Sequence, residues 1–166
     1  MTAVADAPSA GFRIGHGYDI HRIQPGGRLV LGGVTVSTTH SAVAHSDGDV
    51  VLHAVVDAIL GALGQGDIGE LFPNEPKWKG AESRVFVEQV MVRVHSSRMR
   101  VVNVDVTIMA ERPTLKPHKA EMREVIGKLL ETGAVNIKAG TNEGCGAVGR
   151  GEAVAAHAVV LLASVG

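Results

Sequence analysis

Residues 45–49 read His-Ser-Asp-Gly-Asp and lead into an apolar run, Val50 to Leu63, that ends at Gly64. The run has helical periodicity. Ser46 and Asp47 are residue types that accept hydrogen bonds from the free N–H groups at a helix N-terminus, and acidic side chains there complement the helix macrodipole. We therefore predict a helix over residues 50–63 with a polar, acidic start.

The segment before this helix predicts extended structure. Residues 13–21 read Arg-Ile-Gly-His-Gly-Tyr-Asp-Ile-His and alternate as a strand does. A Pro-Gly-Gly turn at residues 25–27 leads to a short hairpin, residues 28–31 and 34–36, around Gly32 and Gly33. Residues 1–12 are small and mostly without periodicity. We expect them to be a disordered tail in front of a single domain of residues 13–166.

The second half of the chain alternates helical and extended patterns. Helices are predicted over residues 82–96 and 117–132, and strands over residues 101–110 and 135–139. Residues 154–162 are almost uniformly aliphatic, so periodicity leaves both a buried strand and a helix open. There are no internal repeats and no linker. The pattern indicates an α/β (α+β) protein.

The composition narrows the classes of function. The chain has 166 residues, a formal net charge of −1 and one cysteine. This balance excludes a basic nucleic-acid footprint, and the cysteine count excludes a disulfide scaffold and fits a reducing, cytoplasmic compartment. Hydrophobic residues make up 45% and aromatic residues only 3%. An aliphatic, glycine-rich chain of this kind could complete its core by associating with copies of itself.

Three side chains form a candidate metal site. Asp19 and His21 are two residues apart in the predicted strand, so both leave the same face. His53 lies in the helix that follows. Two imidazoles and a carboxylate are a ligand set for zinc with one position left open for substrate, and the same set suits non-haem iron. These residue types alone leave the metal undetermined.

Several motifs follow one another between Arg13 and Leu162. They are Gly15-His16-Gly17-Tyr18-Asp19-Ile20-His21, residues 45–54, residues 66–73 (Gly-Asp-Ile-Gly-Glu-Leu-Phe-Pro), residues 104–108 (Val-Asp-Val-Thr-Ile), Arg112-Pro113 with Pro117-His118, and residues 149–152 (Gly-Arg-Gly-Glu). In sequence and in order, these motifs resemble the 2-C-methyl-D-erythritol 2,4-cyclodiphosphate synthase family.

The resemblance implies a fold and an assembly. We expect a mixed four-stranded sheet with about three helices packed on one face, plus the short hairpin. In such a fold residues 153–162 are a strand. The family implies a homotrimer whose sheets face the threefold axis, with active sites between adjacent subunits.

The resemblance also implies an activity. The expected reaction converts 4-diphosphocytidyl-2-C-methyl-D-erythritol 2-phosphate to the 2,4-cyclodiphosphate with release of CMP, in the non-mevalonate route to isoprenoid precursors. This makes the protein a phosphorus–oxygen lyase. One Zn²⁺ per subunit is expected on Asp19, His21 and His53. Mg²⁺ or Mn²⁺ is expected to bridge the substrate phosphates, with Glu143 as its carboxylate.

The site residues follow from the matching positions. His45, Thr141 and Glu143 are the expected catalytic residues. Family positions that contact substrate correspond to Asp19, His21, His45, Ser46, Asp67, Gly69, Ala110, Pro113, Thr114, Leu115, Lys116, Thr141, Asn142, Glu143 and Arg150. The segment from Ala110 to Lys116 is the expected cytidine pocket, and Arg150 is expected to hold an anion near the threefold axis.

Two other functions remain open at this stage. A zinc-dependent phosphohydrolase would use the same three ligands to activate water. A catalytically retired trimeric binder of isoprenoid diphosphates would use Arg150 and an axial cavity. Residues 141–147 also depart from the family pattern, since a common lysine and a common aromatic residue are both missing there.

Overall fold

The computed structural model describes residues 11–166, which form a single α/β domain with one mixed sheet. The sheet has the strand order β4-β1-β7-β5-β6 in this part of the chain. Its strands are β1 (Phe12–Pro25), β4 (His40–Ala42), β5 (Met99–Met109), β6 (Val135–Gly140) and β7 (Ala153–Ser164). β5 and β6 are parallel, and the other pairs are antiparallel. All but the last two residues of the predicted tail, 1–12, lie outside the described residues.

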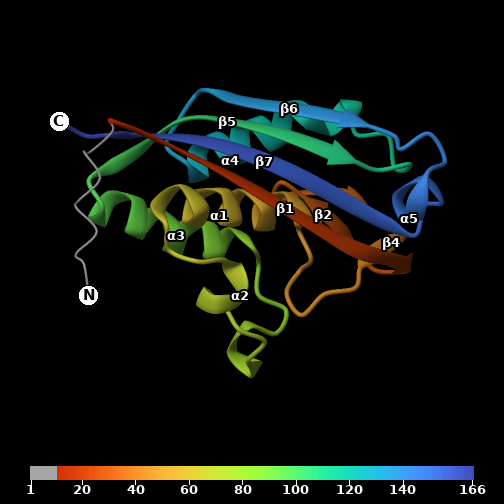
Figure 1. Ribbon diagram of the computed structural model, residues 1–166. Helices are drawn as coiled ribbons and strands as arrows, with labels where there is room; N and C mark the ends of the chain where they lie inside the picture. The colour runs from red at the N-terminus through yellow and green to blue at the C-terminus, as the bar shows by residue number, and fades with distance from the viewer. Residues whose placement is uncertain (1–10) are drawn as a thin grey trace.

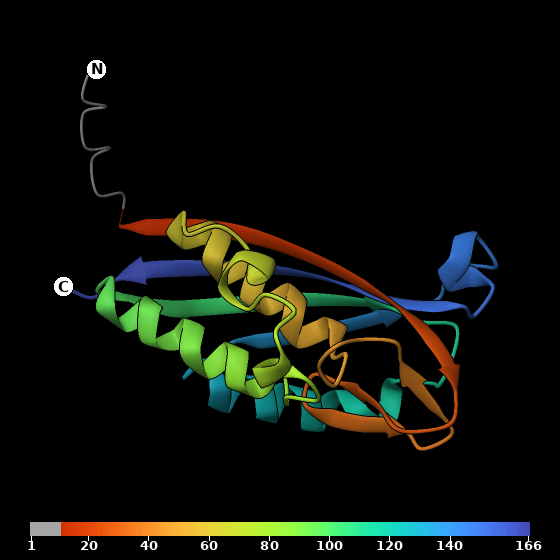
Figure 2. The same ribbon diagram turned by 90° about the horizontal axis from the view of Figure 1, so that it is seen from below.

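The long helices lie on one face of this sheet (Figures 1 and 2). Three are long: α1 (Val50–Leu63), α3 (Arg84–Ser96) and α4 (Lys119–Leu129). Their buried residues share one hydrophobic cluster with the inner face of the sheet. The described chain adds two four-residue helices, α2 (Ile68–Leu71) and α5 (Gly146–Gly149), and two 3₁₀ turns, η1 (Pro76–Trp78) and η2 (Lys116–His118). Within residues 11–166 no helix has the length and apolar character needed to cross a membrane.

The predicted elements are largely confirmed. Helix α1 has the predicted bounds, and Gly64 ends it in the left-handed conformation, with φ of 69°. The hairpin forms from β2 (Leu29–Leu31) and β3 (Val34–Ser37). Gly32 and Gly33, with φ of 61° and 76°, make its two-residue turn. Both positive φ values suit glycine in a tight hairpin turn.

The structure has more elements than the expected four-stranded sheet with about three helices. The extra strand, β4, has three residues and pairs only with Ile23–Pro25 at the end of β1. It has no alternating pattern, and only its tertiary neighbour makes it a strand. The extra helices are single turns, which carry little periodicity. The ambiguous segment 154–162 lies in β7, the central strand between β1 and β5. Its even-numbered residues are buried against the helices, whereas Val159 is exposed on the other face.

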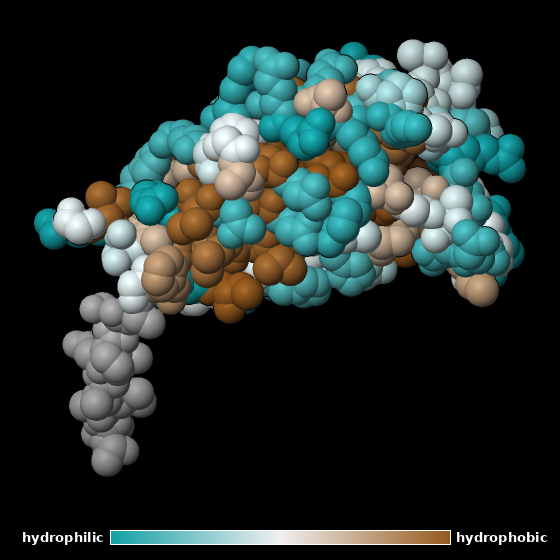
Figure 3. Space-filling view, turned by 90° about the horizontal axis from the view of Figure 1, so that it is seen from above, coloured by the Kyte–Doolittle hydropathy of each residue, from teal (hydrophilic) through white to brown (hydrophobic). Residues whose placement is uncertain are grey.

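Within residues 11–166, the outer face of the sheet has no helix layer like that of the inner face. Even-numbered residues of β1 point outward, and Phe12, Ile14, Tyr18 and Ile20 are 64%, 70%, 45% and 42% exposed. Val159 of β7, paired with His16, adds to the same face. Figure 3 shows the hydrophobic patch that gathers there. Beside Tyr18, Nε2 of His16 lies 2.9 Å from Nδ1 of His157. Contiguous exposed apolar surface of this kind indicates an interaction face.

Candidate metal and substrate site

Strand β1 and helix α1 together position the three candidate metal ligands. Asp19 and His21 leave β1 toward α1, and His53 lies in the first turn of α1. The two elements approach closely because β1 carries Gly15 and Gly17 where it crosses the helix. A Cβ on Gly17 would lie 1.9 Å from the carbonyl oxygen of Ala54, and one on Gly15 only 1.8 Å from a carbonyl of α1. The glycine spacing therefore sets the distance between the ligands of the strand and the ligand of the helix.

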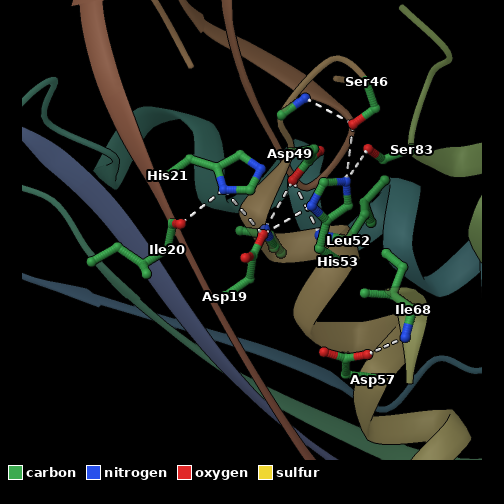
Figure 4. A network of polar contacts seen from close by, with 12 residues as sticks. Asp19, Ile20, His21, Ser46, Asp49, Leu52, His53, Asp57, Ile68 and Ser83 are labelled. Carbon is green, nitrogen blue, oxygen red and sulfur yellow. Dashed lines mark hydrogen bonds and ion pairs between the residues drawn. The ribbon is translucent and has the colours of Figure 1, made fainter. Parts of the chain in front are cut away.

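The three side chains converge (Figure 4). One ligand atom from each of Asp19, His21 and His53 lies within 4.8 Å of the other two. Nδ1 of His53 is 2.8 Å from Oδ2 of Asp19, and Nδ1 of His21 is 3.6 Å from the same oxygen. His21 also donates from Nδ1 to the carbonyl of Ile20 at 2.8 Å, which leaves its Nε2 as the nitrogen with a lone pair. The donor set of one carboxylate and two imidazoles fits a divalent transition metal.

The electrostatics of His53 reflect the nearby carboxylate. Burial of the ring lowers its pKa, but the hydrogen bond and the charge of Asp19 outweigh this, so the pKa is raised above its usual value. The ring therefore faces a concentrated negative charge. A site of this kind attracts a cation.

Asp49 anchors the start of α1. It is fully buried and is the N-cap, in place of the expected Ser46 and Asp47. Its carboxylate accepts from the N–H groups of Gly32, Gly33, Val51 and Leu52 at 2.6–3.1 Å. Burial raises the pKa of Asp49 to about 6, although the hydrogen bonds from these N–H groups lower it. The carboxyl group therefore remains mostly ionised at pH 7. It joins the hairpin turn to the helix that carries His53.

We expect Asp49→Ala to lower the free energy of unfolding by at least about 3 kcal/mol. Loss of an N-cap costs about 0.5–2 kcal/mol, and each buried N–H left without a partner costs about 1–3 kcal/mol. Urea denaturation measures this loss. Asp67→Ala is the control, because Asp67 caps only the short α2 and is exposed. Its expected cost is below about 1 kcal/mol. Equal losses in the two variants would contradict the anchoring role.

A pocket of about 290 Å³ opens beside the triad. His45 and Ser46, two of the expected substrate-binding residues, line it with the three candidate ligands. Nε2 of His45 donates to the carbonyl of Glu75 at 2.8 Å, which fixes the ring at the rim. Gly69 also lines the pocket, whereas Asp67 lies next to it as the cap of α2. The site is therefore a concave cavity with polar groups and candidate metal ligands on one side.

Three aromatic side chains also line this pocket. Phe72 lies 4.5 Å from Phe86 and 5.3 Å from Trp78 between ring centroids. Nε1 of Trp78 is buried and has no hydrogen-bond partner among the described residues. Phe72 and Trp78 are close in the sequence, whereas Phe86 joins them through the packing of α3. Three of the five aromatic side chains thus gather at one pocket.

Asp57, one turn after His53 on α1, positions α2. Its Oδ1 accepts from the N–H of Ile68 at 2.8 Å. Burial raises its pKa, more than that backbone hydrogen bond lowers it. Through this contact α1 holds both its own candidate ligand and the segment that carries Asp67 and Gly69.

A second cavity, of about 400 Å³, lies at the ends of β5 and β6. It gathers most of the expected cytidine segment and the threonine after β6. The predicted residues that line it are Ala110, Pro113, Thr114, Leu115, Lys116 and Thr141. No lining residue is shared with the pocket at the triad. Within the described residues of one chain, these are two separate cavities.

The remaining expected residues lie near the second cavity or away from both. Asn142 donates its backbone N–H to Oε1 of Glu111 at 2.8 Å, and Glu143 accepts from Oγ1 of Thr141 at 2.6 Å. Neither lines the cavity. Arg150 forms a two-point ion pair with Glu152, at 3.0 and 2.9 Å, and lines a third cavity that also contains Arg112.

Ser83, which is fully buried beside His53, is not among the residues predicted for the site. Its only signal in the sequence is that serine is a common residue type just before a helix. The structure places it at the N-cap of α3 but gives it no side-chain cap hydrogen bond.

Fold and site together describe a single α/β domain with a candidate metal site beside a pocket. The sequence profile of the YgbB family matches residues 12–163. The chain is 49% identical over 158 residues to the 2-C-methyl-D-erythritol 2,4-cyclodiphosphate synthase of Bordetella pertussis (strain Tohama I), covering 93% of this chain and 98% of that protein. It is 47% identical over 154 residues to the chloroplastic synthase of Arabidopsis thaliana, covering 91% and 67%.

Solved structures of proteins named IspF or IspDF have the same fold as this chain. The IspF–CDP complex from Plasmodium falciparum superposes with a TM-score of 0.84 at 33% identity, covering 94% of this chain and 98% of that one. The bifunctional IspDF of Campylobacter jejuni gives 0.89 at 38% identity, covering 93% of this chain and 42% of that one. The chain belongs to the YgbB family of 2-C-methyl-D-erythritol 2,4-cyclodiphosphate synthases.

Proposed function

We propose that the protein converts 4-diphosphocytidyl-2-C-methyl-D-erythritol 2-phosphate to 2-C-methyl-D-erythritol 2,4-cyclodiphosphate and CMP. The observation that carries this proposal is the convergence of Asp19, His21 and His53 at the mouth of a pocket, in a chain of this family. An oxygen of the 2-phosphate attacks the β-phosphorus. The P–O bond to the departing CMP breaks, and CMP keeps the bridging oxygen. The enzyme is thus a cyclising phosphorus–oxygen lyase.

In this proposal the triad would hold one Zn²⁺, through a carboxylate oxygen of Asp19, Nε2 of His21 and Nδ1 of His53. When bound, such an ion supplies positive charge that polarises a phosphoryl oxygen. Glu143 is the carboxylate proposed for Mg²⁺ or Mn²⁺ between the substrate phosphates, and magnesium commonly binds through phosphates and few carboxylates. The hydroxyl of Thr141 orients that carboxylate by its hydrogen bond to Oε1.

Each of the two cavities binds a different part of the substrate. His45 and Ser46 bind the 2-phosphate end at the triad, and Asp67 with Gly69 binds the hydroxyls of the erythritol. Residues 110–116 hold the cytidine in the second cavity, where Lys116 supplies a positive charge. Thr141, Asn142 and Glu143 lie at the diphosphate, and Arg150 binds an anion near the threefold axis. The protein mainly aligns and neutralises two phosphates, which is the main requirement of phosphoryl transfer.

We also propose a homotrimer in which the outer faces of the sheets meet at the threefold axis. The exposed apolar side chains of β1 and β7 support it. So does the separation of the two cavities, because a neighbouring subunit can bring its cytidine cavity to the triad of this one. The expected cytoplasmic location is part of the same proposal and rests on the composition alone.

We expect Ile14→Glu to dissociate the trimer. Ile14 is 70% exposed on the outer sheet face, so the charge costs an isolated subunit little, but a trimer must bury three copies. Sedimentation equilibrium measures the mass. Val92→Glu is the control, because Val92 is 63% exposed on α3, in the helix layer, and its substitution leaves the trimer unchanged. A trimeric Ile14→Glu protein would contradict the assembly.

The function is tested by incubating metal-replete protein with the cytidylated 2-phosphate substrate and Mg²⁺ and following the products by ³¹P NMR. A synthase releases CMP together with the cyclic diphosphate. A zinc phosphohydrolase yields a hydrolysed open chain, and a retired diphosphate binder releases no CMP. Either of these last two results would overturn the proposal.

A further inference from the structure

His53 makes hydrogen bonds at both ring nitrogens. Nδ1 faces the carboxylate of Asp19, and Nε2 lies 2.8 Å from Oγ of Ser83 and 3.2 Å from Oγ of Ser46. Figure 4 shows both serines on the side of the ring away from Asp19. The group that holds Nε2 determines which nitrogen carries the proton and which has a free lone pair.

Ser83 is the closer partner, and its neighbours determine to which group its hydroxyl donates. The residue is fully buried, and its hydroxyl donates to Oδ1 of Asp47. Oδ2 of Asp47 accepts from the backbone N–H of Ser83 at 3.0 Å. Because the one hydroxyl proton goes to a carboxylate, Oγ of Ser83 is left to accept from Nε2–H of His53.

The segment that carries Ser83 is itself held against the loop before α1. Gly80 donates its N–H to the carbonyl of His45 at 2.8 Å, and Asp47 donates its N–H to that of Ala81 at 3.0 Å. Ser83 also stands at the N-cap of α3 without capping it. A serine there normally accepts a hydrogen bond from its own helix. This hydroxyl instead contacts His53 and Asp47.

We propose that Ser83 and Asp47 are positioning residues that hold His53 in the tautomer protonated at Nε2, so that the Nδ1 lone pair points at the metal site. His53 donates a hydrogen bond to Ser83, and Ser83 donates one to Asp47. Partners of this kind on a metal-binding histidine fix the ring and raise the basicity of the ligating nitrogen. The proposal rests on the triad as the metal site of the proposed function.

The test measures Zn²⁺ affinity by competition with a chromogenic chelator. We expect Ser83→Ala to bind Zn²⁺ about 10- to 100-fold more weakly than the unmodified protein. Ser46→Ala is the matched control, since Ser46 lies at the same nitrogen without a carboxylate behind it, and we expect a change below about threefold. Ser83→Thr, which keeps the hydroxyl, restores affinity. Ser83→Ala with unchanged affinity, or Ser46→Ala with an equal loss, would overturn the proposal.

A second readout follows the ring itself in the Zn²⁺-loaded protein, where Nδ1 is the proposed ligand atom. The ¹H–¹⁵N signal of Nε2–H should exchange slowly with solvent while Ser83 accepts its hydrogen bond, and we expect Ser83→Ala to speed that exchange. Asp47→Asn tests the same relay if Ser83→Ala fails to fold, because an amide NH₂ turned toward Ser83 reverses the hydroxyl. An Asp47→Asn variant whose Nε2–H exchanges as slowly as in the unmodified protein, with full Zn²⁺ affinity, counts against the proposal. An unmodified protein that binds no Zn²⁺ would instead refute the proposed metal site.

Discussion

We expect His53→Ala to lose its bound Zn²⁺ and to lower kcat/KM by at least about a thousandfold. The residue supplies one of three candidate ligands, and Asp19 and His21 alone leave the ion with a carboxylate and a single imidazole. A catalytic metal contributes several kcal/mol of charge stabilisation, and each ~1.4 kcal/mol corresponds to a factor of ten in rate. Metal content by mass spectrometry and CMP release measure the two losses.

We expect the His53→Ala protein to keep its fold. His53 lies at the edge of the core, 8% exposed, and its partners are polar groups that water can reach through the pocket. His95→Ala is the control, because His95 lies on α3 and only pairs with the exposed Glu131 at 3.1 Å. It should keep both metal and activity. Stoichiometric metal or normal turnover in His53→Ala would show that the triad is not the metal site.

The second large effect is expected for Gly17→Ala, which should lose more than about 3 kcal/mol of stability or fail to fold. The new Cβ would lie 1.9 Å from a backbone oxygen and 2.8 Å from two further backbone atoms of α1. Overpacking usually costs about 1–3 kcal/mol when side chains can move. Here the obstacle is the helix backbone, so β1 must shift away from α1. Thermal and urea unfolding measure the loss.

The same substitution should also weaken metal binding in any protein that folds. Asp19 and His21 are carried by the strand that must move, and His53 by the helix it moves from. Gly61→Ala is the control in the same helix. Its Cβ would meet only one atom, the carbonyl oxygen of His16 at 3.9 Å, and alanine favours a helix over glycine by about 1 kcal/mol. A stable Gly17→Ala protein with intact metal binding would contradict the close contact.

The chain shows how much of a site local sequence can predict. Asp19, His21 and His53 were identified from residue types and spacing, and the structure brings them together. Most of the segment proposed to bind cytidine, located by resemblance, lines one cavity with Thr141. Asp67, Asn142, Glu143 and Arg150 do not line the cavity at the triad, and their proposed roles need the neighbouring subunit or the substrate. An interface between chains leaves no periodic signal in one of them.

Helix α1 was predictable to both of its ends because its periodicity, its polar start and the glycine at its end are all local properties. Strand β4, the central place of β7 and the direction of the Ser83 hydroxyl were decided only by the tertiary structure. A short strand exists through its partner, and a uniformly apolar segment takes the conformation that its neighbours can pair with. A hydroxyl donates to the carboxylate that folding brings beside it, here from 36 residues away.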